Sequence, residues 1–111
     1  MIGWQTVYDN NPRKVYLSSA NTSKDKVQNI IGGEACLWTE TADGLAIEAK
    51  LWPRGSALAE RLWSDPDSSW KEAETRFIHH RQRIVSRGIL ADAVQPEWCH
   101  QNEKRCRDWN S

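Results

Sequence analysis

Trp38 and Glu40 lie two residues apart at the end of the string GGEACLWTE, and together these residue types could bind a sugar. The flat face of an indole packs against the C–H face of a pyranose ring, and a carboxylate accepts hydrogen bonds from the hydroxyl groups of the sugar. The same spacing also fits a core tryptophan followed by a solvated or helix-capping glutamate, and the spacing alone favours this plainer interpretation. A sugar site therefore needs support from the surrounding elements.

The element that must position these two side chains is an apolar run from Val27 to Trp38, which is typical of a buried parallel strand. A helix is less favoured because Gly32 and Gly33 would each cost about 1 kcal/mol in a helix interior. In a strand, side chains alternate between the two faces, so Trp38 and Glu40 would lie on the same side at the carboxyl end. In (β/α)8 barrels, the carboxyl ends of the strands carry the active site.

Two helices are predicted after this strand. The first spans residues 53–64 and begins with a proline at its first position, where the missing N–H costs nothing. Its small residues permit close approach to a sheet, as in a helix that coats a barrel. The second spans residues 69–87, where a serine at the start and Glu72 could form a capping box, and Gly88 ends it.

Residues 1–13 and 19–27 are expected to be irregular and to lie outside the core, because turn-forming and polar residues dominate them. The second of these segments includes Asn21-Thr22-Ser23, a weak signal for N-linked glycosylation at Asn21.

Other charged and polar residues could belong to a pocket or a metal site, but a role on the protein surface explains them more simply. Arg54 and the pair Glu60–Arg61 could reach into a pocket, yet salt bridges on the helix surface explain them more simply. His79 and His80 are adjacent, and neighbouring helix residues point about 100° apart, so they could not easily share one ion. We therefore expect surface histidines and no metal site.

The three cysteines predict one disulfide, between Cys99 and Cys106 in the polar tail, and leave Cys36 free. Zinc is the alternative, but two cysteines seven residues apart with only His100 between them have poor ligand spacing. A disulfide in so short a loop would contribute roughly 2–3 kcal/mol. It implies an oxidising compartment.

The composition describes a globular chain of 111 residues without a global charge bias, because 15 basic side chains balance 15 acidic ones. Nucleic acid is therefore not an expected partner. We see no apolar run long enough to span a membrane and no signal peptide at the amino terminus. Seven tryptophans exceed what so small a core needs, so some should face a ligand or further protein.

Two strings, IIGGEACLWTE and LWPRGSALAERLW, occur in the order and separation seen in one enzyme family. They resemble the closing strand and final barrel helix of the β-N-acetylhexosaminidases, glycoside hydrolase family twenty. GWQTVYDN before them and QPEWCHQNEKRC after them extend the resemblance over nearly the whole chain, and arthropod members are the most similar.

This resemblance implies an α/β fold, the C-terminal part of a (β/α)8 TIM barrel with its last strand, last barrel helix and a terminal helix. A full barrel needs about 250 residues, so the fold would be incomplete as given. Residues 1–88 would form the C-terminal portion of the catalytic barrel, and residues 89–111 would form a tail with the disulfide.

The resemblance also assigns roles to matching residues. Trp38 would be one aromatic wall of the pocket for a terminal N-acetylhexosamine, and Glu40 would hydrogen-bond the O4 and O6 hydroxyls of the sugar. The tail disulfide of the family fits Cys99 and Cys106, and Trp4 is expected to have a packing role. No cofactor is implied.

The family removes terminal non-reducing GlcNAc or GalNAc residues from oligosaccharides or glycoconjugates, as in chitin or glycan degradation, by substrate-assisted retaining catalysis. The acetamide oxygen of the substrate attacks the anomeric carbon, an aspartate orients the acetamide and a glutamic acid protonates the leaving oxygen. This chain contains no adjacent Asp-Glu pair and no H-x-G-G-D-E string, so we expect no catalytic residue here and an inactive isolated chain.

The parent protein would be a secreted or lysosomal glycosidase that acts on carbohydrate and could be a homodimer. Two alternatives stay open for these 111 residues. One is a non-catalytic sugar-binding chain, and the other is a purely structural fragment that does not fold alone, because its strand would expose unpaired edges.

Overall fold

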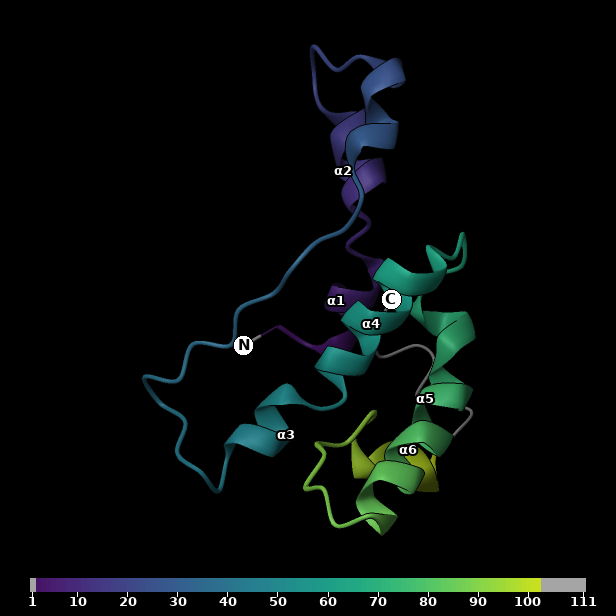
Figure 1. The fold of residues 1–111 in the computed structure, drawn as a ribbon. Helices are drawn as coiled ribbons and strands as arrows, with labels where there is room; N and C mark the ends of the chain where they lie inside the picture. The colour runs from purple at the N-terminus through teal and green to yellow at the C-terminus, as the bar shows by residue number, and fades with distance from the viewer. Residues whose placement is uncertain (1, 103–111) are drawn as a thin grey trace.

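Helices make up all the regular secondary structure of residues 2–102, which are the residues that this computed structural model describes (Figure 1). The elements, in chain order, are α1 (Trp4–Asp9), α2 (Pro12–Ser18), the 3₁₀ helix η1 (Lys24–Asn29), α3 (Ile47–Leu51), α4 (Arg54–Ser64), α5 (Trp70–Ser86) and α6 (Glu97–Gln101). None of these described helices is both long enough and apolar enough to cross a membrane.

The core forms where α1 packs against α4 and α5, with Trp4 at its centre. The indole of Trp4 is 3% exposed and stacks on the ring of Phe77, with 4.6 Å between ring centroids. Its Nε1 donates a hydrogen bond of 2.7 Å to the carbonyl oxygen of Val94, far along the chain. The expected packing role of Trp4 is therefore confirmed. The buried residues of this cluster are Trp4, Tyr8, Ala57, Ala73, Phe77 and Val94.

The prediction that residues 1–13 are irregular and outside the core was wrong. Trp4, Val7 and Tyr8 have the i, i+3, i+4 spacing of one helix face, and this face packs into the core. The short helix α1 is stabilised by this burial, since isolated helices of six residues are not stable in water.

The two longer helices were predicted correctly. Helix α4 begins at Arg54, one residue later than predicted, because Pro53 is the N-cap and not the first helical residue. Helix α5 begins after Ser69, and the capping box is present: Glu72 accepts a hydrogen bond of 3.0 Å from the backbone N–H of Ser69. Gly88 follows α5 with a φ of +88°, a conformation that favours glycine and ends the helix.

The predicted strand within residues 27–38 is absent from the structure. The helix η1 takes the first part of it, and residues 31–39 form neither helix nor strand. A parallel strand needs neighbouring strands for its backbone hydrogen bonds and layers to cover both faces, and the described residues contain no strand that could pair with it. Ile31 is consequently 95% exposed. The last strand of the predicted barrel, and with it the barrel itself, is therefore not seen within residues 2–102.

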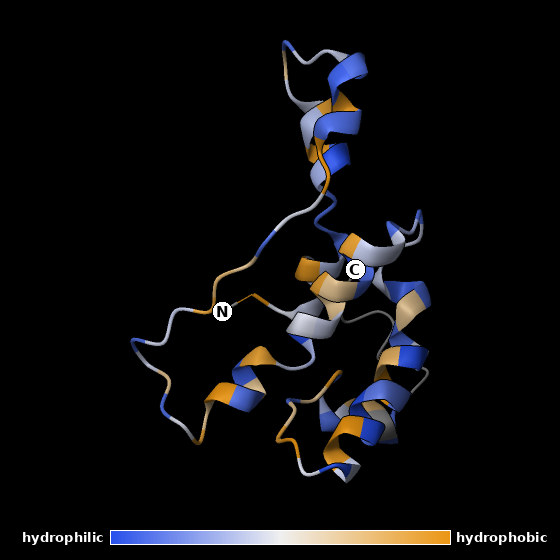
Figure 2. Ribbon diagram, viewed as in Figure 1, coloured by the Kyte–Doolittle hydropathy of each residue, from blue (hydrophilic) through white to orange (hydrophobic). Residues whose placement is uncertain are grey.

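The loop predicted at residues 19–27 is likewise partly helical, because η1 covers residues 24–29. Helices α2 and η1 pack against each other and form an arm that projects from the core (Figure 1). Apolar residues also lie on the arm, on α3 and along the extended segment between η1 and α3, outside the core (Figure 2). The radius of gyration is 15.9 Å, whereas a compact domain of about 100 residues has one of about 13 Å.

Candidate functional site

The extended segment between η1 and α3 carries both residues of the predicted sugar site. The side chain of Trp38 is 75% exposed, and Glu40 is exposed as well. The structure therefore leaves both side chains accessible to a ligand and rules out the plainer interpretation that Trp38 is a core aromatic within this chain. Whether the two side chains lie side by side against one sugar stays a prediction.

Hydrogen bonds from α3 hold the carboxyl end of this segment at Thr41, the residue after Glu40. The ammonium group of Lys50 on α3 donates hydrogen bonds to the carbonyl oxygen of Thr41, at 2.7 Å, and to Thr41 Oγ1, at 3.2 Å. The carboxylate of Asp43 accepts from the backbone N–H groups of Leu45 and Ala46 at 3.1 and 3.0 Å. The backbone just after Glu40 is thus tied to the helix that follows it.

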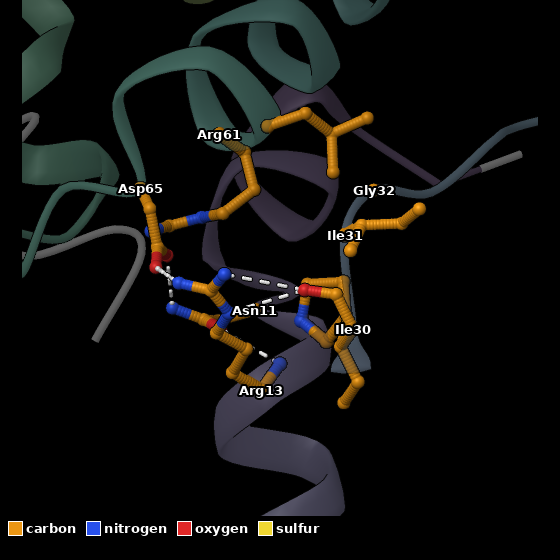
Figure 3. A pocket seen from close by; sticks show the side chains of 9 residues that line it. Asn11, Arg13, Ile30, Ile31, Gly32, Arg61 and Asp65 are labelled. Atoms are coloured by element: carbon orange, nitrogen blue, oxygen red, sulfur yellow. Dashed lines mark hydrogen bonds and ion pairs between the residues drawn. The ribbon is translucent and has the colours of Figure 1, made fainter. Parts of the chain in front are cut away.

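The amino end of the segment is held by Arg13 on α2 (Figure 3). Its Nη2 and Nε donate to the carbonyl oxygen of Ile30 at 3.2 and 3.4 Å, and its Nη1 pairs with the carboxylate of Asp65 at 3.2 Å. Asn11 donates to the other oxygen of Asp65 at 2.9 Å and caps α2 with its own side-chain oxygen. These residues surround a cavity of about 60 Å³, which is too small for a sugar. This cluster is therefore an anchor for the segment.

Arg61 is buried, with 3% exposure, and joins α4 to the core. It donates hydrogen bonds of 2.6 Å to the carbonyl oxygens of Tyr8 and Pro66. The salt bridge predicted for Arg61 is present, since its Nη1 lies 3.8 Å from Asp65 Oδ1, but the arginine is buried and not on the helix surface. Its side chain also lines the small cavity beside Arg13 (Figure 3). For Glu60 the surface salt bridge is confirmed, because its carboxylate pairs with Arg76.

Arg54 lines a cavity of about 250 Å³ between the start of α4 and residues 92–96, and its guanidinium makes no salt bridge in the described part of the chain. It donates hydrogen bonds to the backbone carbonyl oxygens of Lys50, at 2.6 Å, of Ala49 and of Ile2. Arg54 therefore connects the end of α3 to the beginning of α4.

A second candidate lies between α4 and α5, where Ser56 Oγ and His80 Nε2 are 2.9 Å apart at a cavity of about 550 Å³. Burial lowers the pKa of His80, and the positive charges of Arg83 and Arg87 lower it further. The prediction of a surface histidine was wrong for His80, which is half-buried, whereas His79 is exposed.

Metal binding finds no support in the described part of the chain, where no group of three or more His, Cys, Asp or Glu side chains could hold an ion. Cys36 is exposed and free, as predicted. Cys99 is buried, with 1% exposure, but its predicted partner Cys106 lies outside the described residues, so their disulfide stays a prediction. Asn21 is exposed, with a φ of 64°, and its glycosylation also stays a prediction.

Sequence reasoning missed Arg13 and Lys50, the two residues that hold the ends of the segment. Each is one basic residue on a surface helix, and nothing in its local sequence indicates a backbone carbonyl group as its partner. Lys50 lies nine positions after Thr41, and Arg13 lies seventeen before Ile30.

Comparison with known proteins shows which family this chain resembles. Residues 1–66 match the model of glycosyl hydrolase family 20, catalytic domain. The chain is 49% identical over 105 residues to a chitooligosaccharidolytic beta-N-acetylglucosaminidase of Ostrinia furnacalis and 43% identical over 105 residues to the enzyme of the same name of Bombyx mori; each match covers 95% of this chain. It is 43% identical over 101 residues to beta-hexosaminidase subunit beta of Homo sapiens, a match that covers 89% of this chain.

The matched regions are 16% of the length of the two insect proteins and 17% of the human one, so the chain spans about one sixth of these relatives. The family match contains both Trp38 and Glu40, and the catalytic domain of this family is a TIM barrel. The chain therefore belongs to glycosyl hydrolase family 20.

Proposed function

We propose that the complete protein to which this chain belongs hydrolyses terminal, non-reducing β-linked N-acetylhexosamine residues of oligosaccharides or glycoconjugates. The observation that carries the proposal is the family match across residues 1–66, which contains an exposed tryptophan and an exposed glutamate two positions apart. Relatives named for beta-N-acetylglucosaminidase and beta-hexosaminidase activity support the choice of sugar.

In this proposal, Trp38 and Glu40 bind the sugar and do not break the glycosidic bond. The indole provides a flat apolar surface for the ring, and the carboxylate accepts hydrogen bonds from sugar hydroxyl groups. The acid and the residue that orients the acetamide come from outside these 111 residues, because the sequence has no adjacent Asp-Glu pair. The isolated chain is therefore inactive.

The proposal also covers the architecture of the complete protein. There the segment within residues 27–38 pairs with neighbouring strands as the last strand of a (β/α)8 barrel, and α4 coats that barrel. Residues 1–88 belong to the barrel with its final helices, and residues 89–111 form a tail closed by the disulfide Cys99–Cys106. The complete protein is secreted or lysosomal, carries a glycan at Asn21 and acts as a homodimer.

Activity of the complete coding region tests this function. The complete protein and the isolated chain of residues 1–111 would be expressed separately, and each would be assayed with a chromogenic N-acetyl-β-glucosaminide. We expect hydrolysis by the complete protein and none above background by the isolated chain. Hydrolysis by the isolated chain would show that the catalytic acid lies within these 111 residues and would contradict the proposal. A complete protein that binds the sugar without hydrolysing it would support the alternative of a non-catalytic sugar-binding protein.

A further inference from the structure

The segment with Trp38 and Glu40 is held by few hydrogen bonds, and one of them lies next to the glutamate. In the 111-residue chain, residues 31–39 form no helix and no strand, and the strand proposed for the complete protein ends at Trp38. In neither case does a ladder of backbone hydrogen bonds hold Thr41. Lys50 Nζ reaches the carbonyl oxygen of Thr41, the residue directly after Glu40, at 2.7 Å. It also reaches the hydroxyl oxygen of Thr41, at 3.2 Å.

The backbone of Lys50 is in turn held by a hydrogen bond from α4. Its backbone carbonyl oxygen accepts a hydrogen bond of 2.6 Å from Arg54 Nε, and Arg54 is the first residue of α4. Because α4 packs against α1 in the core, this connection runs from the core through Arg54 and Lys50 to the backbone beside Glu40. Both hydrogen bonds have a charged donor, which makes them stronger than neutral ones.

Lys50 leaves the carboxylate of Glu40 available. Within residues 2–102 its ammonium group hydrogen-bonds Thr41 and forms no ion pair with Glu40. A direct ion pair would compete with sugar hydroxyl groups for the carboxylate oxygens, whereas a bond to the neighbouring backbone fixes position without occupying them. Binding sites depend on such support, since a group misplaced by about 1 Å loses much of its effect.

We propose that Lys50 is a positioning residue for the sugar site: it holds the backbone beside Glu40 and thereby fixes where the carboxylate meets the sugar. This inference rests on the proposed function for its meaning at a sugar, but the hydrogen bond itself can be tested without one. Its first test is amide hydrogen exchange of residues 39–46 in the 111-residue chain, with α5 as an internal reference.

We expect Lys50→Met to speed exchange in residues 39–46 by roughly three- to tenfold, the range for losing one ordinary hydrogen bond, because this bond is exposed to solvent. Exchange in α5 should stay unchanged. Lys50→Arg retains a cationic donor and should restore most of the protection. Lys14→Met, which removes an exposed lysine from α2, is the matched control and should have no effect on residues 39–46. Equal exchange in the wild-type chain and in Lys50→Met would overturn the inference, as would a wild-type segment that exchanges like an unstructured peptide.

The second test measures kinetics in the complete protein. Lys50→Met should lower kcat/KM at least threefold through a raised KM, while Lys50→Arg stays close to wild type and the melting temperature changes equally little in both. An unchanged KM in Lys50→Met would overturn the positioning role even if the exchange rate had changed. A complete protein without glycosidase activity would contradict the proposed function, and the exchange experiment would then decide the inference.

Discussion

The guanidinium carbon of Arg61 lies 5.1 Å from the centre of the Tyr8 ring, while Nε of the same arginine donates a 2.6 Å hydrogen bond to the carbonyl oxygen of Tyr8. One buried arginine thus contacts both the side chain and the backbone of one residue at the end of α1. A second donor of Arg61 satisfies the carbonyl oxygen of Pro66, in the turn between α4 and α5. Arg61 therefore joins α4 to α1 and to the turn that leads into α5.

Replacing Arg61 with methionine should destabilise the fold by roughly 2–4 kcal/mol, because two carbonyl oxygens lose their charged donor. Urea denaturation followed by circular dichroism measures the change. Arg83→Met, an exposed arginine on α5, is the control and should change the free energy of unfolding by less than about 0.5 kcal/mol. Similar losses in the two variants would show that Arg61 does not stabilise the core.

Replacing Trp4 with phenylalanine should cost roughly 1–3 kcal/mol, because the carbonyl oxygen of Val94 loses its buried indole donor. Trp63→Phe makes the same chemical change on a side chain that is 93% exposed, so the chain itself offers a matched control. Thermal unfolding of both variants distinguishes the two sites. Equal melting temperatures would contradict the central position of Trp4 in the core.

The capping box of α5 should make the stability of this helix depend on pH. The hydrogen bond from the Ser69 side chain is the largest cause of a lowered pKa of Glu72, followed by backbone hydrogen bonds. A carboxyl group whose pKa is lower in the folded state stabilises it fully above the ordinary glutamate pKa and loses this contribution as the pH falls through the lowered pKa. Unfolding measured over this acidic range should show a smaller pH dependence in Glu72→Gln than in the wild type. The same dependence in both would contradict the assignment.

The parts of the fold that the sequence predicts are those fixed by local interactions. Ser69, Glu72 and Gly88 determine the ends of α5 within a few residues of themselves, and the structure has these ends where they were predicted. Helix α1 was missed because its stability comes from distant partners, such as Phe77 and Val94 for Trp4. A local pattern contains no information about these partners.

The candidate site likewise contains residues that the sequence predicted and one that it missed. Trp38 and Glu40 were found from their types, their spacing and the resemblance around them, and the structure leaves both exposed. The strand predicted to carry them was wrong for this chain, because a strand depends on neighbours that the described residues do not provide. Lys50 was missed because its partner is the backbone of Thr41, and side-chain chemistry alone does not identify such a contact.

The kinetics of Glu40→Gln in the complete protein test most directly the central claim, that Trp38 and Glu40 hold the sugar. The amide keeps the shape of the side chain but loses the charged hydrogen bonds to sugar hydroxyl groups. We predict a loss of roughly 1.5–3 kcal/mol, or about 10- to 150-fold in kcat/KM, because binding of both substrate and transition state weakens. Asp25→Asn, at an exposed carboxylate on η1, should leave kcat/KM unchanged. Wild-type kinetics in Glu40→Gln would contradict the account and remove Glu40 from the sugar site.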